Sequence, residues 1–78
     1  METPLLLRVV DVEYLKDYTM NLEFNDGTKK KINFLPLLNG KMFEPLRDRN
    51  KFIQFGLNSW TIEWSNGADM SPEFLYSL

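Results

Sequence analysis

The sequence predicts an α+β protein: a small five-stranded antiparallel sheet with a short middle helix and a C-terminal helix packed on one face. Five short segments alternate apolar and polar residues with the period of a β-strand, and clusters of Asn, Asp, Ser and Gly separate them. The first strand, residues 8–14, follows Pro4, which cannot donate a ladder hydrogen bond and is typical of an edge strand. The 78 residues are enough for a single domain, residues 1–78.

The first hairpin joins strands over residues 18–24 and 28–34. A three-residue loop with Gly27 in the left-handed conformation pairs Met20 with Ile32 and keeps the apolar side chains of both strands on one face. A two-residue loop would instead turn Ile32 toward solvent. The three-residue loop is therefore predicted.

A second hairpin joins strands over residues 53–57 and 60–64. A two-residue turn, Asn58-Ser59, would pair Phe55 with Ile62 and keep the apolar side chains on one face. Between the two hairpins, the sequence predicts one short helix.

That helix runs from Phe43 to Asp48 and has Pro45 in its first turn. Phe43 and Leu46 are three residues apart, so both would lie against the sheet.

The C-terminal helix begins at Ser71, which is a good N-cap, with Pro72 at the first helical position. Met70 and Leu75 have the spacing of a hydrophobic staple, which fixes the angle of a helix against its neighbours. Before this helix, Ser65-Asn66-Gly67 ends the last strand with a turn.

Trp60 and Trp64 could form an exposed aromatic platform for bases or sugars. They alternate in phase with Ile62, however, and the nearest charge is that of Glu63. Both indoles are therefore predicted to lie in the core.

The composition lacks the residues on which most catalytic and metal sites depend. There is no Cys and no His, which removes thiolate chemistry, the commonest metal ligand and the commonest general base. We therefore predict a protein that is not an enzyme and has no cofactor and no metal. The three leucines near the N-terminus are too few for a signal sequence or a membrane span, so a cytoplasmic location is expected.

The charge is distributed unevenly along the chain. The net charge is −4 for residues 1–27, +5 for residues 28–51 and −3 for residues 52–78, which sums to −2. The candidate interaction surface lies in the basic segment 29–51 and consists of Lys29, Lys31, Arg47, Arg49 and Lys51. Lys30 is expected to face inward and to reach solvent through its long stem.

Four motifs occur in the chain: F-x-D-G at residues 24–27, F-x-x-L-x-D at 43–48, W-x-N-G-x-D at 64–69 and P-x-x-L-Y at 72–76. In this order, over residues 8–77, the chain resembles a bacterial family of unknown function, domain-of-unknown-function family 2442 (DUF2442). The resemblance implies a small α+β domain, found alone or ahead of a helix-turn-helix DNA-binding domain, in some cases beside a small partner gene in a toxin–antitoxin-like arrangement. It implies no catalytic residues, and we expect no DNA-binding extension in this chain.

The motif residues are interpreted as structural: Asp26, Gly27, Trp64, Asn66, Gly67, Asp69, Pro72 and Tyr76. Asp26 would bond to its own turn, and Asp69 would brace the loop before the helix. The alternative is a small-ligand site near Asp69, since a pair of carboxylates among Asp26, Asp69 and Glu73 could perform acid–base chemistry or hold a hard cation. The structural interpretation is favoured because Gly27 and Pro72 already account for the local sequence.

The leading hypothesis is a protein-interaction module that binds another protein or a second copy of itself as a homodimer, in an accessory or antitoxin-like role beside a small neighbouring protein. A free sheet edge would suit such a module. The alternative is a weak nucleic-acid-binding or transcription-regulatory accessory domain that uses the basic segment 29–51. It is less favoured because alternation splits the three lysines from Lys29 to Lys31 between two faces. Association through this segment should weaken with salt and on reversal of Lys29, Lys31 and Arg49 to Glu. No membrane partner is expected.

Overall fold

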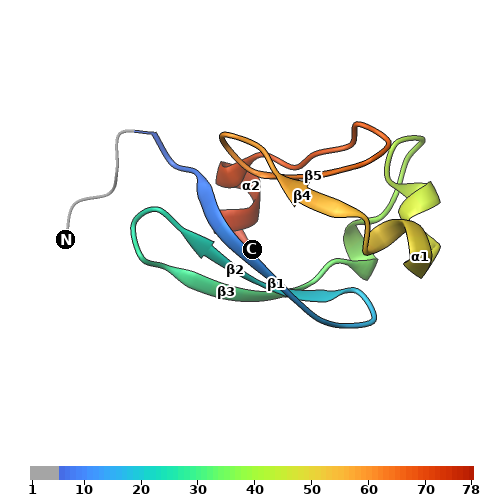
Figure 1. The fold of residues 1–78 in the computed structure, drawn as a ribbon, viewed down its shortest axis with the longest axis horizontal. Coiled ribbons are helices and arrows are strands. Elements are labelled where there is room, and N and C mark those ends of the chain that lie inside the picture. The colour runs from blue at the N-terminus through green and yellow to red at the C-terminus, as the bar shows by residue number, and fades with distance from the viewer. Residues whose placement is uncertain (1–5) are drawn as a thin grey trace.

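The computed structural model describes residues 6–78 (Figure 1), and Pro4 lies outside the described residues. Three strands come first: β1 (Val9–Lys16), β2 (Thr19–Phe24) and β3 (Lys29–Asn33). Three short helical segments follow: the 3-10 helices η1 (Leu35–Leu37) and η2 (Glu44–Arg47) and the α-helix α1 (Arg49–Phe52). Strands β4 (Phe55–Leu57) and β5 (Ile62–Trp64) precede the C-terminal helix α2 (Pro72–Ser77). The predicted α+β class is confirmed.

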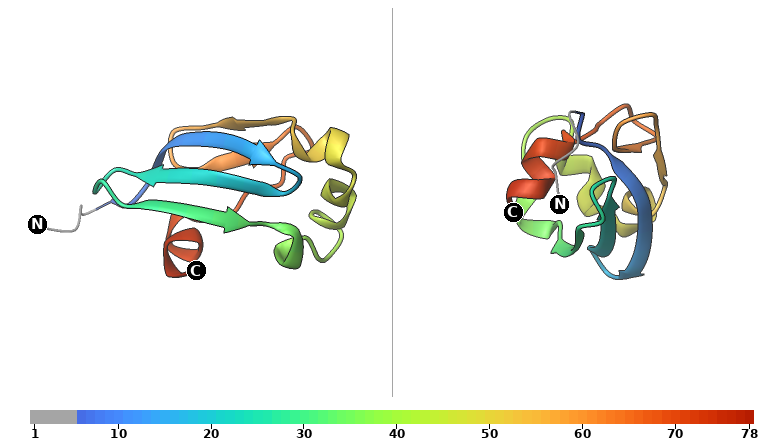
Figure 2. Two further views of the ribbon diagram at one scale, coloured as in Figure 1. Left: turned by 90° about the horizontal axis from the view of Figure 1, so that it is seen from below. Right: turned by 90° about the vertical axis from the view of Figure 1, so that its left-hand side faces the viewer.

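The strands form two antiparallel sheets, β1-β2-β3 and β4-β5, so the prediction of one five-stranded sheet is wrong (Figure 2). The two sheets meet beside Val9, whose amide N–H donates to the carbonyl oxygen of Trp60 at 2.9 Å. Directly after this bond, the register of β1 against β2 shifts between Val9 and Asp11. Irregularities of this kind bend and twist a strand, and the described strands of the two sheets share no ladder.

The β2–β3 hairpin has the predicted register, with Met20 opposite Ile32 and Glu23 opposite Lys29. Gly27 has a φ of 89°, as the three-residue loop requires. The side chains of Met20 and Ile32 are both buried, so the apolar face of the hairpin is the one predicted.

The β4–β5 hairpin differs from its prediction. Phe55 lies opposite Trp64 and Leu57 opposite Ile62, so the loop holds the four residues 58–61. The two-residue turn and the pairing of Phe55 with Ile62 are therefore wrong. The apolar alternation is the same in both registers, because they differ by two residues on one strand.

The four-residue loop explains why only one of the two predicted core indoles is buried. The Oδ1 atom of Asn58 accepts from the amide N–H of Trp60 at 2.7 Å and from that of Thr61 at 2.8 Å. This Asx arrangement leaves Trp60 in the loop, with 49% of its surface exposed, whereas Trp64 in β5 is 2% exposed. The prediction of a buried Trp60 is wrong and that of a buried Trp64 is confirmed.

The middle of the chain holds two short helices where the sequence predicts one. The predicted segment, residues 43–48, is present as η2 with Pro45 in its first turn, and α1 follows it directly. They meet at Asp48, whose extended backbone ends η2 and whose carboxylate caps α1 by accepting the amide N–H of Asn50 at 3.0 Å. Leu46 is buried and Phe43 packs against the core, as predicted.

The end of helix α1 includes a residue that the sequence assigns to the next strand. The predicted strand begins at Ile53, but this residue is the C-cap of α1 and is exposed. Phe52 is buried in its place.

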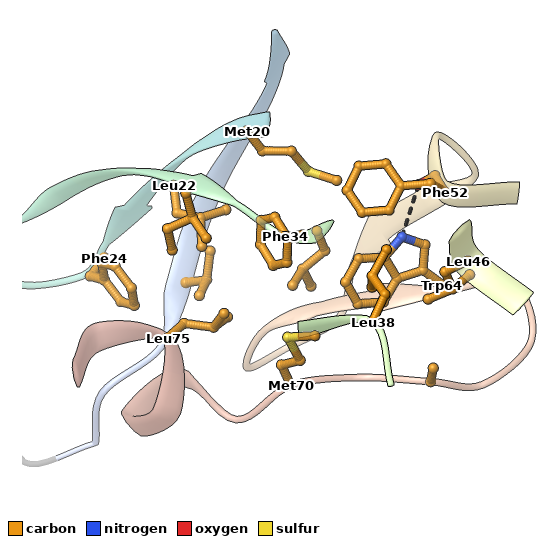
Figure 3. Packing of buried hydrophobic residues seen from close by; sticks show 14 residues of the cluster. Met20, Leu22, Phe24, Phe34, Leu38, Leu46, Phe52, Trp64, Met70 and Leu75 are labelled. Carbon is orange, nitrogen blue, oxygen red and sulfur yellow. Dashed lines mark hydrogen bonds between the residues drawn. The ribbon is translucent and has the colours of Figure 1, made fainter. Parts of the chain in front are cut away.

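One hydrophobic core fills the space between the sheets and the helices (Figure 3). The ring of Trp64 lies 5.9 Å from that of Phe34 and 5.8 Å from that of Phe52, centroid to centroid. The indole N–H of Trp64 donates to the carbonyl oxygen of Phe52 at 2.8 Å, which fixes α1 on β5. At the other end of the core, Leu75 of α2 lies near Phe24 of β2 (Figure 3).

Helix α2 begins as predicted. The hydroxyl of Ser71 accepts the amide N–H of Phe74 at 3.2 Å, and Pro72 is the first helical residue. Met70 and Leu75 are both buried, as a hydrophobic staple requires.

Candidate interaction surface

The five basic side chains of the candidate interaction surface do not lie together. Lys29 and Lys31 are exposed on β3, whereas Arg47, Arg49 and Lys51 belong to η2 and α1. Figure 1 places α1 at the end of the molecule opposite the β2–β3 turn. The basic segment 29–51 is therefore divided between two regions of the surface.

Both arginines make contacts within the molecule. The guanidinium of Arg47 donates to the carbonyl oxygen of Leu38 at 2.8 Å and to the side-chain oxygen of Asn39 at 3.0 Å, which holds the loop after η1. Arg49 lies 3.6 Å from the carboxylate of Asp17, in an exposed ion pair of small stabilising value. Within residues 6–78 no other ion pair forms, so the two exposed lysines of β3 keep their charges available.

β3 is an edge strand, because the order β1-β2-β3 gives it one neighbour. Two groups that flank β3 bond across the hairpin at 2.8 Å: the carbonyl oxygen of Thr28 accepts the amide N–H of Phe24, and the amide N–H of Phe34 donates to the carbonyl oxygen of Tyr18, just before β2. Hydrogen-bonded positions alternate along an antiparallel ladder, so the peptide groups of Lys29, Lys31 and Asn33 point away from β2. No backbone hydrogen bond from the described part of the chain reaches these three residues.

A groove of about 380 Å³ runs beside this free edge. It is lined by Lys30, Lys31, Ile32 and Asn33 of β3, by Pro36 and Leu37 of η1, and by Leu78. In the left view of Figure 2, η1 and α2 lie beyond the edge of β3 at different positions along its length. The groove combines apolar and basic lining residues, and no acidic side chain belongs to it among the residues described.

The outer face of the three-stranded sheet carries charges of both signs. Two rows of side chains cross it from β1 to β3: Asp11, Glu23 and Lys29, and then Glu13, Asn21 and Lys31. In these two rows the negative charge is on β1 and β2, and the positive charge is at the free edge.

The F-x-D-G and P-x-x-L-Y motifs meet in space through Asp26 and Tyr76. The Tyr76 hydroxyl donates to Asp26 Oδ2 at 2.7 Å, and the Thr28 amide N–H donates to Asp26 Oδ1 at 2.9 Å. The rings of Tyr76 and Phe24 pack edge to face, with their centroids 5.1 Å apart. The hydrogen bond from Tyr76, followed by that from the Thr28 amide, lowers the pKa of Asp26 below its usual value. This cluster fixes α2 to the β2–β3 turn.

Lys30 faces inward and is half-buried, as the sequence predicts. Its ammonium group donates to the carbonyl oxygen of Leu78 at 2.6 Å and lies 5.5 Å from the centroid of the Tyr76 ring. The side chain therefore crosses from β3 to α2 instead of extending freely into solvent.

The W-x-N-G turn repeats the construction of the F-x-D-G turn, over residues 64–68 and 24–28. In both, the aromatic residue donates its amide N–H to the carbonyl four residues on at 2.8 Å, and the glycine donates back to the aromatic residue at 2.9 Å. The side-chain oxygen of Asp26 or Asn66 accepts the amide N–H two residues on. The φ of Gly67 is 88°, close to the 89° of Gly27.

This repetition escaped the sequence interpretation, although the pattern aromatic-x-Asx-Gly occurs twice in the chain. The turn at residues 64–68 returns the backbone to β5, where Asp69 forms an antiparallel bridge with Glu63. Asn66 also donates from its side-chain nitrogen to the carbonyl oxygen of Met42 at 2.9 Å, which links this turn to the loop before η2.

The two acids near the start of α2, Asp69 and Glu73, are both exposed. Asp69 is joined to β5 by its backbone, and its carboxylate is exposed and makes no hydrogen bond to the described residues. Glu73 is exposed in the first turn of α2. Across residues 6–78, no three His, Cys, Asp or Glu side chains come together as a possible metal site.

Two anchoring side chains were not identified from the sequence. Asn25 accepts the amide N–H of Arg8 at 3.1 Å and donates to the carbonyl oxygen of Leu6 at 2.8 Å, so it fixes the chain before β1 to the turn. The buried hydroxyl of Thr61 donates to the carbonyl oxygen of Met70 at 2.6 Å. Both contacts join segments far apart in sequence, and no local pattern indicates them.

The fold and this surface define a small α+β domain whose motif residues build turns and helix anchors, and whose three-stranded sheet has an uncovered edge. In the part of the chain described, no helix has the length and apolar character needed to cross a membrane. The chain belongs to the family described as protein of unknown function (DUF2442), whose model matches residues 9–78 and confirms the resemblance. Neither a curated protein nor a solved structure matched the chain.

Proposed function

We propose that this chain is a non-enzymatic protein-interaction module that receives an extended segment of a second protein along the free edge of β3. The observation that carries the proposal is the set of outward-pointing peptide groups of Lys29, Lys31 and Asn33, which have no backbone partner within residues 6–78. Such groups bind an added strand by main-chain hydrogen bonds, and the adjoining groove can accept its side chains.

The rigidity of the hairpin supports this role. β3 is paired to β2 along its length, its turn is fixed by Asp26, and its inner face is anchored by the buried Ile32. An edge held in this way loses little conformational freedom when a partner strand is added, which favours binding. An accessory or antitoxin-like role beside a small neighbouring protein is one biological form of this proposal.

The nucleic-acid alternative receives less support. Phosphate binding favours a continuous basic surface, whereas Lys29 and Lys31 lie on β3 and the basic residues of η2 and α1 lie at the other end of the molecule. Arg47 is moreover occupied by contacts with Leu38 and Asn39.

Affinity purification from the native host tests the proposal with the variant Lys31→Pro and the control Lys31→Ala. Proline removes the outward N–H of Lys31, and because that group has no internal partner, the β2–β3 ladder keeps its hydrogen bonds. Alanine removes the same side chain and keeps the N–H. We expect one protein to be retained in stoichiometric amount by the wild type and by Lys31→Ala, and to be lost with Lys31→Pro.

Circular dichroism is the control that checks whether each variant is folded. Failure of the wild type to retain any protein contradicts the proposal as a whole. Equal retention by Lys31→Pro and Lys31→Ala contradicts the use of the β3 edge.

A further inference from the structure

We infer that the segment received by β3 is an extended strand of a partner protein in which acidic and apolar residues alternate. This inference rests on the proposed function, because it specifies the chemistry of the segment that the edge binds. It follows from the two faces of β3, which differ in the side chains that they present to a neighbouring strand.

Residues directly opposite one another in neighbouring strands have their side chains on the same face of the sheet. Lys29 and Lys31 are exposed on the outer face, and Lys30 and Ile32 are turned inward. An added antiparallel strand would exchange hydrogen bonds with Lys29 and Lys31, whose peptide groups point to the free edge. The residues opposite these lysines are consequently on the outer face, beside two ammonium groups.

The charge of the outer face selects acids at these positions. On β2, Glu23 lies opposite Lys29 and Asn21 lies opposite Lys31. Neither lysine forms an ion pair in the described part of the chain. A Glu or Asp on the added strand would be directly opposite each lysine, whereas a Lys or Arg would place like charges together, which is destabilising.

The groove selects apolar residues at the alternate positions. The side chains that point inward from the added strand would meet Ile32 of β3 and Pro36, Leu37 and Leu78 beyond it. Leu78 is 48% exposed, so an apolar neighbour would remove its surface from water. β3 is five residues long, which gives space for two acids and two apolar residues in register with it.

A second copy of the chain offers a similar pattern, since Val10 to Tyr14 also alternates apolar and acidic residues. These residues are already paired with β2 on one side. On the other side, Val9 donates its N–H to Trp60, in the loop between β4 and β5. Contact between β3 of one copy and β1 of the next would also be heterologous, an arrangement that produces rings or open filaments and is less common than a symmetric dimer. A partner protein is therefore the better occupant.

NMR titration of the ¹⁵N-labelled chain tests the inference with two capped peptides, one containing Glu-Val-Glu-Val and one containing Lys-Val-Lys-Val. We expect the acidic peptide to bind with a Kd below about 1 mM and to shift the amide signals of Lys29, Lys31 and Asn33 most strongly. The basic peptide should bind at least about tenfold more weakly, and added salt should reduce the difference. In the double variant Lys29→Glu and Lys31→Glu, the preference should reverse.

Three results of the NMR titration would overturn the inference: no binding of the acidic peptide at millimolar concentration, equal binding of both peptides, or shifted signals that lie outside β3. Concentration-dependent sedimentation of the chain that disappears in Lys31→Pro would show that a second copy occupies the edge, and would overturn it too. Failure here, combined with loss of the native partner from Lys31→Pro, leaves the proposed function intact. A wild type that retains no partner contradicts the proposed function itself.

Discussion

The hydroxyl of Tyr76 donates a 2.7 Å hydrogen bond to the carboxylate of Asp26, a residue fifty positions earlier in the chain. The bond connects the last helix to the β2–β3 turn, and each residue belongs to one of the four motifs on which the family resemblance rests. Asp26 therefore has two structural functions, because its other oxygen accepts the Thr28 amide N–H within the turn. The two contacts give this motif residue a structural role.

The first prediction concerns the pH dependence of stability. The pKa of Asp26 is lowered below 3.8 in the folded protein, chiefly by Tyr76 and then by Thr28. A carboxyl group whose pKa is lower in the folded state stabilises the protein above its unfolded pKa, and this contribution is lost as the pH falls through the folded value. Tyr76→Phe should therefore lower the Tm at pH 7, and the difference from wild type should shrink toward pH 3.

Tyr14→Phe is the matched control, because the Tyr14 hydroxyl donates to the backbone carbonyl of Asp17, not to a carboxylate. Its difference in Tm from wild type should stay constant over the same pH range. If the effect of Tyr76→Phe is equally constant, the assignment of the pKa shift to this hydrogen bond is wrong.

The second prediction concerns the two repeated turns. Gly27→Ala and Gly67→Ala should each reduce the free energy of unfolding by about 1 kcal/mol, because both glycines have a positive φ. A new Cβ at Gly27 meets no atom within 4 Å, so the cost there is one of backbone conformation. Gly56→Ala, in β4 and without a positive φ, should change stability little in urea titrations. Equal effects at all three positions would count against the proposed turn geometry.

The third prediction separates the two tryptophans. Trp64→Ala should cost about 3–5 kcal/mol, because the indole is 2% exposed and would leave a cavity between Phe34 and Phe52. Trp60→Ala should be far less costly, since that side chain is 49% exposed. In single-tryptophan variants made by changing the other residue to Phe, iodide should quench the fluorescence of Trp60 and spare that of Trp64. Efficient quenching of both would show that Trp64 is not in the core.

The fourth prediction compares the two polar residues of the second turn. Asn66→Ala should cost about 1–2 kcal/mol, because its side chain bonds to Met42 and to the amide of Ala68. Asp69→Ala should change the free energy of unfolding by no more than about 0.5 kcal/mol, since only its backbone contacts β5. Thermal unfolding measures both. A larger loss with Asp69→Ala would mean that its carboxylate makes a contact important for the fold.

The two hairpins show how far alternation predicts register. In the first, a shift by one residue would have exposed Ile32, so burial alone selected the correct loop. In the second, the two candidate registers differ by two residues and keep the same face, so alternation could not distinguish them. The deciding interaction was the Asn58 side chain, which bonds to two amides of the loop and lengthens it.

The candidate surface was predictable only in part. Charge counting identified Lys29 and Lys31, but it also included Arg47, whose guanidinium is used to hold Leu38 and Asn39. The sequence indicated an edge for the strand at residues 8–14, and β1 does lie at one edge of its sheet, but no residue pattern indicated that β3 is the other edge. The bond from Val9 to Trp60 and the register shift after Val9 mark the place where the two sheets meet, and neither has a sequence signature.

The two aromatic-x-Asx-Gly turns also have a consequence for the order of folding. Each is closed by hydrogen bonds that span at most four residues, so each can form by local search within about 1–10 μs. The bond from Tyr76 to Asp26 closes a far longer loop, so we expect it to form after the transition state. Tyr76→Phe should therefore accelerate unfolding and leave the refolding rate unchanged, whereas Gly27→Ala should slow refolding in stopped-flow measurements.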